Sequence, residues 1–260
     1  MLQFSKTEYE NLVNILSLSL SDRYSELEAV FKPRRNNQPF TRNDFENIFK
    51  RLKSLGLKET EEPEQLDIKI ISDDKRNSNV RVTINSIGSI KEYCDKNDIN
   101  LLENQSMIRY MKKHRYSVKK SGKRESIKPL FLNNYNFKVN LNHEQNCREK
   151  DIDSIKKDFT KKNKTFRLKK RYSFITKDKL FRFDLSIIKN SKTNPRTGEY
   201  IYARDLQSSG TLDNTEFYEF EIEFIGHTYM KKIEEVKRLE IMINSFVSNI
   251  GIILQVLRNT

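Results

Sequence analysis

Two short strings in this chain alternate acidic residues with apolar ones. SELEAVF lies near the beginning of the sequence and YEFEIEF near its end, and their acids are Glu26, Glu28, Glu219, Glu221 and Glu223. Alternation with a period of two is typical of a β-strand that has one charged face and one apolar face. Each string therefore predicts a strand with carboxylates along one side.

Carboxylates on two adjoining strands would repel one another. Two unit charges about 5 Å apart repel by roughly 3 kcal/mol per pair at an effective dielectric constant of about 20. A divalent cation relieves this repulsion, and oxygen-only ligands suit Mg²⁺ or Mn²⁺. If the two strands meet, the sequence predicts a magnesium or manganese site. If they do not, both are ordinary amphipathic strands whose acids lie in water.

The chain is strongly basic. Its 260 residues include 49 Lys and Arg against 36 Asp and Glu, a formal net charge of +13. Such a surplus favours a polyanionic partner, first of all a nucleic acid or a phosphate-bearing molecule. Because Cys94 and Cys147 are its only cysteines, a disulfide framework or a cysteine-rich zinc site is excluded, and we expect a reducing intracellular compartment. The glycines form no phosphate-binding loop of the Walker or Rossmann type.

Patterns elsewhere in the chain predict the elements that must position these strands. Helical spacing predicts helices over residues 5–18, 41–56, 89–96 and 230–257, the second with Thr41 and Asp44 as capping partners. Alternation predicts a hairpin of 66–72 and 80–85 around the turn DDKRNSN, a strand over 107–118, and strands beginning at Phe137, Thr165, Leu180 and Glu199. The basic segment SVKKSGKRES is expected to be a solvated turn. Without regular strand–helix alternation, this set predicts a mainly antiparallel α+β fold.

The other predicted strands also have one charged face. Beside the five glutamates, those faces carry Arg81, Lys138, Glu144, Arg167, Lys169, Arg171, Arg182 and Asp184. If the sheet closes on itself with the helices packed outside, these residues line a charged tunnel. Such a lining suits a metal-bound polyphosphate, since carboxylates hold the cation and Arg and Lys hold phosphate oxygens. The alternative is an open sheet whose charged face is solvated.

The order of the strings along the chain resembles a known enzyme family. An ELEAVF strand, an RLKKR strand followed by one containing RFD, and a final EFEIE strand resemble the tunnel-type, metal-dependent RNA triphosphatases. The likeness is closer to the N-terminal triphosphatase region of capping enzymes from large cytoplasmic DNA viruses, and NCREK at 146–150 adds to it. It covers most of residues 20–225.

This resemblance implies an antiparallel tunnel of eight strands with a charged interior and helices packed outside. It implies removal of the γ-phosphate from 5′-triphosphate RNA, which leaves a diphosphate end in the first step of mRNA capping. A single triphosphatase domain would span 1–260, with 230–260 as a C-terminal helix that could lead into guanylyltransferase and methyltransferase domains. The expected location is the cytoplasm of an infected cell, in the viral factory, or the virion, and we expect no membrane association.

The resemblance also implies roles for individual residues. The expected metal ligands are Glu26, Glu28, Glu221 and Glu223. The expected phosphate-binding residues are Arg81, Lys138, Arg167, Lys169, Arg171 and Arg182. The last four of these, with Asp184, would also be catalytic, and Glu219 or Glu144 would orient the attacking water. Val30 departs from the pattern, because several relatives place a basic residue there, so that contact must be absent or supplied elsewhere.

Two other functions fit the same residues. A tunnel enzyme could act on inorganic polyphosphate, thiamine triphosphate or free nucleotides, and nucleoside triphosphates are expected as secondary substrates even of an RNA enzyme. A non-catalytic, basic RNA-binding β-domain would use its acids only as salt-bridge partners. Exposed aromatic residues beside the bases would favour that domain, but Phe166, Tyr172 and Phe174 fall on the face opposite Arg167, Lys169 and Arg171.

Overall fold

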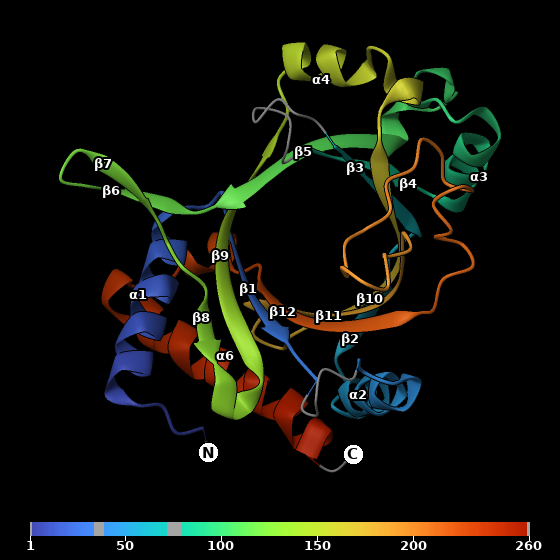
Figure 1. The fold of residues 1–260 in the computed structure, drawn as a ribbon. Helices are drawn as coiled ribbons and strands as arrows, with labels where there is room; N and C mark the ends of the chain where they lie inside the picture. The colour runs from blue at the N-terminus through green and yellow to red at the C-terminus, as the bar shows by residue number, and fades with distance from the viewer. Residues whose placement is uncertain (1, 34–38, 72–79, 259–260) are drawn as a thin grey trace.

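Alternating side chains allow a sheet to close with its charged face inward, and eight antiparallel strands of this chain do so (Figure 1). The computed structural model describes residues 2–33, 39–71 and 80–258. Around the barrel the order is β1-β12-β11-β10-β3-β4-β5-β9, and pairing of β9 with β1 closes it. These strands are β1 (Ser25–Phe31), β3 (Gln65–Ile70), β4 (Val80–Asn85), β5 (Ile108–Arg115), β9 (Phe137–Asn146), β10 (Lys164–Ile175), β11 (Phe181–Asn190) and β12 (Phe217–Phe224).

Four shorter strands lie outside the closed barrel. β2 (Lys58–Glu61) pairs with β10, and β8 (Leu130–Leu132) pairs with β9. β6 (Ser117–Lys120) and β7 (Lys123–Ser126) form a hairpin that projects away from the barrel (Figure 1). The segment predicted as a solvated turn is therefore a two-stranded arm, and its β7 side chains are exposed as expected.

Helices cover the outside of the barrel. They are α1 (Lys6–Ser21), α2 (Arg42–Ser54), α3 (Ile87–Lys96), α4 (Glu149–Lys156), α5 (His227–Met230) and α6 (Glu235–Arg258). Short 3₁₀ turns cover Ile99–Leu101, Gln105–Met107, Asn133–Tyr135 and Phe159–Lys161. The predicted capping box of Thr41 and Asp44 is present at α2. The predicted fold class, an α+β antiparallel barrel with helices outside, is confirmed.

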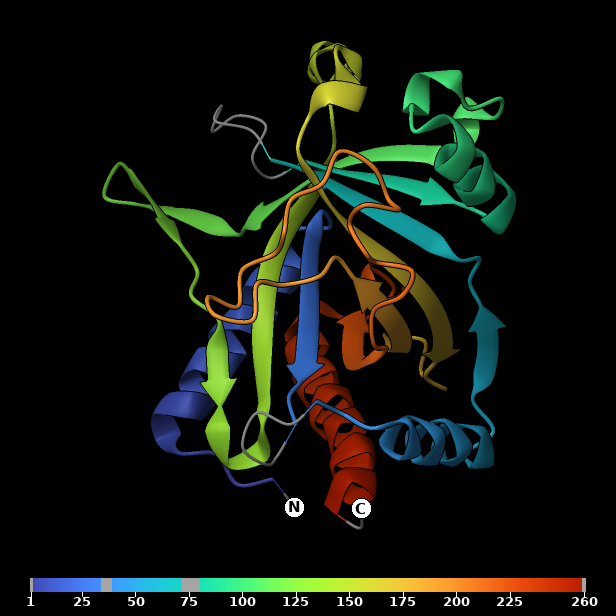
Figure 2. The same ribbon diagram turned by 45° about the vertical axis from the view of Figure 1, so that its right-hand side comes forward.

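Two apolar cores hold these helices against the barrel. On one side α1, α2 and α6 cover strand side chains such as Leu27 and Ile222. On the other side α3 and α4 cover β3, β4 and β10, where Val82 and Phe166 are buried (Figure 2). Because the apolar faces point outward into these cores, the opposite faces of the same strands point into the barrel.

The strand predicted from Glu199 does not form. Residues 191–216 instead make an irregular connection between β11 and β12, held by isolated bridges of Lys164 with Ala203 and of Thr193 with Tyr200. On one edge of β10, β11 pairs with residues 167–175, and on the other edge β2 and β3 are paired. This connection therefore finds only a short free edge of β10 at Lys164, where Ala203 forms its bridge. The predicted turn DDKRNSN, residues 73–79, lies outside the described residues.

The C-terminal helix α6 is long and apolar enough to cross a membrane by length and composition. That property was not expected from the sequence. In the fold the helix packs against α1 and α2, and its residues Met242, Phe246 and Ile250 are fully buried among them. Of the most apolar 18-residue stretch of the helix, 33% is buried in the fold.

Phe246 tests that reading of α6. Its ring is buried and lies 5.6 Å from the ring of Phe181, centroid to centroid. We expect Phe246→Ala to lower the free energy of unfolding by about 3–5 kcal/mol, as for other large-to-small core changes. The exposed Ser248→Ala is the control and should change stability little. Denaturant unfolding without detergent measures both, and equal stability of the two variants would contradict the packing.

Candidate active site

The barrel encloses a cavity of about 580 Å³. Its described lining includes eight acids: Glu26, Glu28, Glu62, Asp67, Glu144, Glu219, Glu221 and Glu223. It also includes eight bases: Arg81, Arg109, Lys113, Lys138, Arg167, Lys169, Arg171 and Arg182. The formal charges of these groups balance, so the side chains alone leave no surplus for a bound polyanion. An anion as highly charged as a triphosphate would need either broken ion pairs or an added cation.

Strand register brings the two predicted acidic strings together. β1 pairs directly with β12, and Glu28 lies opposite Glu223. On the other side of β12, Arg182 of β11 also lies opposite Glu223. The condition set by the sequence for a metal site, that the two acidic strands adjoin, is therefore met.

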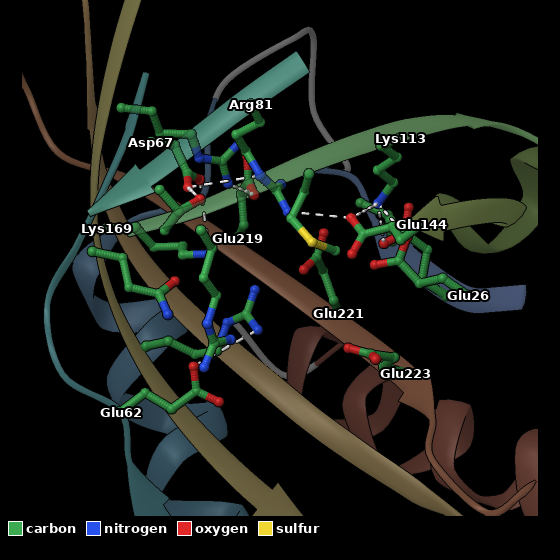
Figure 3. A pocket seen from close by; sticks show the side chains of 18 of the residues that line it. Glu26, Glu62, Asp67, Arg81, Lys113, Glu144, Lys169, Glu219, Glu221 and Glu223 are labelled. Carbon is green, nitrogen blue, oxygen red and sulfur yellow. Dashed lines mark hydrogen bonds and ion pairs between the residues drawn. The ribbon is translucent and has the colours of Figure 1, made fainter. Parts of the chain in front are cut away.

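Lys113 of β5 is the cation among the acids of β1. Its Nζ lies 2.5 Å from an oxygen of Glu26, 3.5 Å from Glu28 and 3.9 Å from Glu144 (Figure 3). Glu28 is only 9% exposed and also accepts hydrogen bonds from the amides of Asn140 and Asn142. Burial alone would lower the pKa of Lys113, but these carboxylates raise it above the ordinary lysine value. Lys113 is therefore held in its charged form.

Asp184 supports two arginines from beneath the cavity surface. It is fully buried, and both of its oxygens accept hydrogen bonds from Arg182, at 2.8 and 2.9 Å. Arg171 lies 3.2 Å away, and the Ser173 hydroxyl donates at 2.6 Å. Asp184 is not among the residues that line the cavity, so it acts on the site by orienting Arg171 and Arg182. Its predicted catalytic role stays a prediction.

Four of the remaining predicted residues form two pairs between strands of the barrel. Arg167 donates to Glu219 at 2.6 Å, and Arg81 donates to Glu144 at 3.2 Å (Figure 3). Both glutamates expected to orient water are thus paired with arginines. Lys169 is 6% exposed, and burial together with Arg171 and Arg167 lowers its pKa to about 8, despite the nearby Asp67.

Lys138 lies beside the position where the sequence departs from the resemblance. Val30 lines the cavity and lies opposite Lys138 in the pairing of β1 with β9. Lys138 also lines the cavity. The basic group that Val30 does not provide is therefore present on the adjoining strand.

Burial disfavours the charged form of three carboxylates in the cavity. Burial, with the neighbouring Glu28 and Glu219, raises the pKa of Glu221 to about 7. Burial, against the attraction of Arg182 and with repulsion by Asp184, raises the pKa of Glu223 to about 7. Burial also raises the pKa of Glu26. A cation close to the oxygens of any of these three carboxylates would stabilise its charged form.

The predicted metal ligands fit a hard divalent cation by their chemistry. Glu221 makes no hydrogen bond or ion pair with any described residue, and Oε2 of Glu26 lacks a hydrogen bond of good geometry although Lys113 is close to it. The donors are carboxylate oxygens only, as Mg²⁺ and Mn²⁺ prefer. Across the described ranges, no three His, Cys, Asp or Glu side chains converge at metal-binding distances. Glu26, Glu28, Glu221 and Glu223 would hold the ion, with Lys113 as the cation it competes with.

Several lining residues were missed in the sequence. They are Glu62, Gln65, Asp67, Asn85, Arg109, Met111 and Lys113. Asp67 could have been found, since Leu66 and Ile68 flank it in an alternating run. Lys113 was harder to find, because its neighbour Lys112 is also basic and hides the alternation of β5.

Replacement of Glu221 by Gln tests the repulsion directly. A carboxylate whose pKa rises on folding contributes stability below its unfolded value of about 4.5, and loses it as the pH rises toward 7. At pH 8 with a chelator present, we expect Glu221→Gln to raise the free energy of unfolding by about 1–2 kcal/mol, a moderate value because water reaches the cavity. The gain should vanish near pH 4. Thermal unfolding measures this, with the exposed Glu10→Gln as control. A loss of stability at pH 8 would contradict the account.

The fold of this chain is similar to that of solved RNA triphosphatases. It matches the RNA triphosphatase domain of a trifunctional mimivirus mRNA capping enzyme at a TM-score of 0.63 and 20% identity, over 98% of this chain and all of that one. It matches the RNA triphosphatase Pct1 of S. pombe at a TM-score of 0.56 and 14% identity, over 97% of this chain and 94% of that one. No family model and no curated protein matches the sequence. At these identities the likeness shows a shared fold.

Proposed function

We propose that this chain is a metal-dependent RNA 5′-triphosphatase that hydrolyses the γ-phosphate of triphosphate-ended RNA and leaves a diphosphate end. The observation that carries the proposal is the pairing of two glutamate strands, β1 and β12, inside a barrel whose strand β10 presents Arg167, Lys169 and Arg171 to the same cavity. The shared fold with two RNA triphosphatases supports the choice of reaction.

Each part of the lining has a role in this reaction. A divalent ion bound by the four glutamates would neutralise charge on the phosphate oxygens. Arg171 and Arg182, fixed by Asp184, would donate hydrogen bonds to the same oxygens. Arg167 and Arg81 would bind phosphate by exchanging their present partners, which frees Glu219 and Glu144 to accept a proton from water or to orient it. The reaction needs no covalent nucleophile.

Neutrality of the lining favours a metal as part of this proposal. Eight acids already balance eight bases, so a triphosphate would bring about four uncompensated negative charges into a partly dehydrated space. Divalent cations that enter with the substrate would restore the balance. A purely basic cavity would bind the same anion without help.

The wider setting of the reaction belongs to the same proposal. We propose that residues 1–260 act as one triphosphatase domain of an mRNA capping enzyme, which other capping domains would accompany. Its location would be the cytoplasm of an infected cell or the virion. A tunnel hydrolase of inorganic polyphosphate or nucleoside triphosphates is the second candidate, since the cavity itself recognises phosphate and not RNA.

The metal assignment predicts the effect of removing single carboxylates. Glu26→Ala, Glu28→Ala and Glu223→Ala should each lower metal-dependent phosphate release by about 100-fold or more, because charge stabilisation by a bound metal provides several kcal/mol. Exposed Glu10→Ala should be neutral. Release of phosphate from γ-labelled triphosphate RNA, with circular dichroism as the check on folding, measures the effect. Near-normal activity in any two of the three variants would overturn the assignment.

Salt dependence separates an RNA enzyme from a small-polyphosphate hydrolase. The net charge of +13 should add affinity for an RNA body through contacts outside the barrel, and counterion release makes that gain weaken with salt. We expect kcat/KM for triphosphate-ended RNA to exceed that for ATP at low salt, and the ratio to fall steeply as salt rises. Equal values at every salt concentration, or a preference for tripolyphosphate, would favour the second candidate.

A further inference from the structure

A second cavity opens at one end of the barrel. It has a volume of about 390 Å³ and lies where β3 ends and β10 begins. Its lining shares Asp67, Arg81, Lys113 and Arg167 with the central cavity. The two spaces therefore meet at Arg81 and Arg167, which are predicted phosphate-binding residues.

The chemistry of this mouth differs from that of the barrel interior. Beyond the shared charged residues, it is lined by Lys69, Val80, Thr165, Asn190 and Tyr200, together with Phe166. Val80 and Phe166 are almost fully buried, so the exposed aromatic surface is that of Tyr200, which lies at this mouth with the amide of Asn190 and the hydroxyl of Thr165. That mixture suits a heterocyclic base and its sugar, whereas the interior suits phosphates.

Tyr200 is held in place by its backbone while its ring stays free. It belongs to the connection between β11 and β12, which runs across the mouth of the barrel (Figure 1). Tyr200 forms an isolated β-bridge with Thr193. The backbone amide of the next residue, Ile201, donates to the carbonyl of Lys192 at 2.8 Å. The side chain is 47% exposed and makes no hydrogen bond or ring contact with any described residue.

Lys164, the first residue of β10, holds the same connection against that strand. Lys164 and Ala203 exchange backbone hydrogen bonds of 2.8 and 3.0 Å. The buried Lys164 side chain donates to the carbonyl of Arg204. The backbone on either side of Tyr200 is fixed by these bonds, so no loop has to be ordered when a ligand binds there, which lowers the entropy cost of binding.

We propose that this mouth is a nucleoside subsite, in which Tyr200 stacks on the base of the 5′-terminal nucleotide while Arg81 and Arg167 hold the phosphate nearest to it. The inference rests on the proposed function, since it places the triphosphate in the barrel. Stacking on one aromatic ring tolerates any base, as an enzyme that acts on RNA ends of any sequence requires.

The test compares ligands with and without a base. We expect Tyr200→Ala to raise the KM for ATP and for triphosphate-ended RNA by about fivefold or more, because loss of one base stack weakens binding by at least this factor. Tyr200→Phe should retain wild-type values. Hydrolysis of inorganic tripolyphosphate, which has no base, should be unchanged in both. Tyr202 is more exposed, at 53%, but does not line the mouth, so Tyr202→Ala is the matched control.

A binding measurement keeps this inference separate from the proposed function. The ligands for calorimetric titration are adenosine 5′-(β,γ-imido)triphosphate and tripolyphosphate. Compared with the wild type, Tyr200→Ala should bind the nucleotide more weakly and tripolyphosphate equally well. If Tyr200→Ala weakens binding of the nucleotide but not of tripolyphosphate, while the wild type does not hydrolyse RNA ends, the proposed function fails and the subsite stands. Equal loss of both ligands, or equal behaviour of Tyr200→Ala and Tyr202→Ala, would overturn the subsite.

Discussion

The structure depends on charge balance inside a closed barrel. Among the described residues, sixteen charged side chains line one cavity, in equal numbers of acids and bases. Some ion pairs link strands that are distant in sequence, such as Lys113 of β5 with Glu26 of β1, and others link consecutive strands, such as Arg182 of β11 with Glu223 of β12. Loss of one partner would leave a poorly hydrated charge, which costs more than the pair contributes when intact. The two apolar cores, with α1, α2 and α6 on one side and α3 and α4 on the other, stabilise the barrel around this charged interior.

The same balance explains what the cavity can do. Glu221 and Glu223 are disfavoured as anions by burial, as their raised pKa values of about 7 show. Arg171 and Arg182 are oriented by Asp184 toward the space those acids share. A cation and a phosphate that enter together compensate the charges of both these acids and these arginines. Either one alone compensates only one of the two sets. The site is therefore suited to a metal-bound polyphosphate, and the mouth beside Tyr200 is suited to the nucleoside attached to it.

Sequence reasoning succeeded where one strand carries the whole signal. Alternation alone predicted which side chains of β1, β10 and β12 share a charged face, because a run such as FRLKKRYSF divides into one charged and one apolar face. The prediction that these faces point inward also used the resemblance in the order of the strings along the chain. Sequence reasoning failed where position depends on tertiary contacts. The place of Lys113 beside the acids depends on the register of β5 with β9. The run from Glu199 met only a short free edge of β10 at Lys164, because β11, β2 and β3 pair with the rest of that strand. The burial of Asp184 beneath two arginines likewise depends on the closed barrel.

Coupling between metal and triphosphate tests the central claim most directly. Calorimetric titration with the non-hydrolysable adenosine 5′-(β,γ-imido)triphosphate would be repeated with Mn²⁺ and with a chelator, and the Mn²⁺ affinity measured with and without the nucleotide. The neutral lining predicts that Mn²⁺ strengthens nucleotide binding by about tenfold or more, and that the nucleotide strengthens Mn²⁺ binding by the same factor. The contribution of metal–nucleotide binding in free solution must be subtracted from the measured coupling. Glu28→Ala should abolish the coupling that remains. Equal affinity of the wild type for the nucleotide with and without Mn²⁺ would contradict the account.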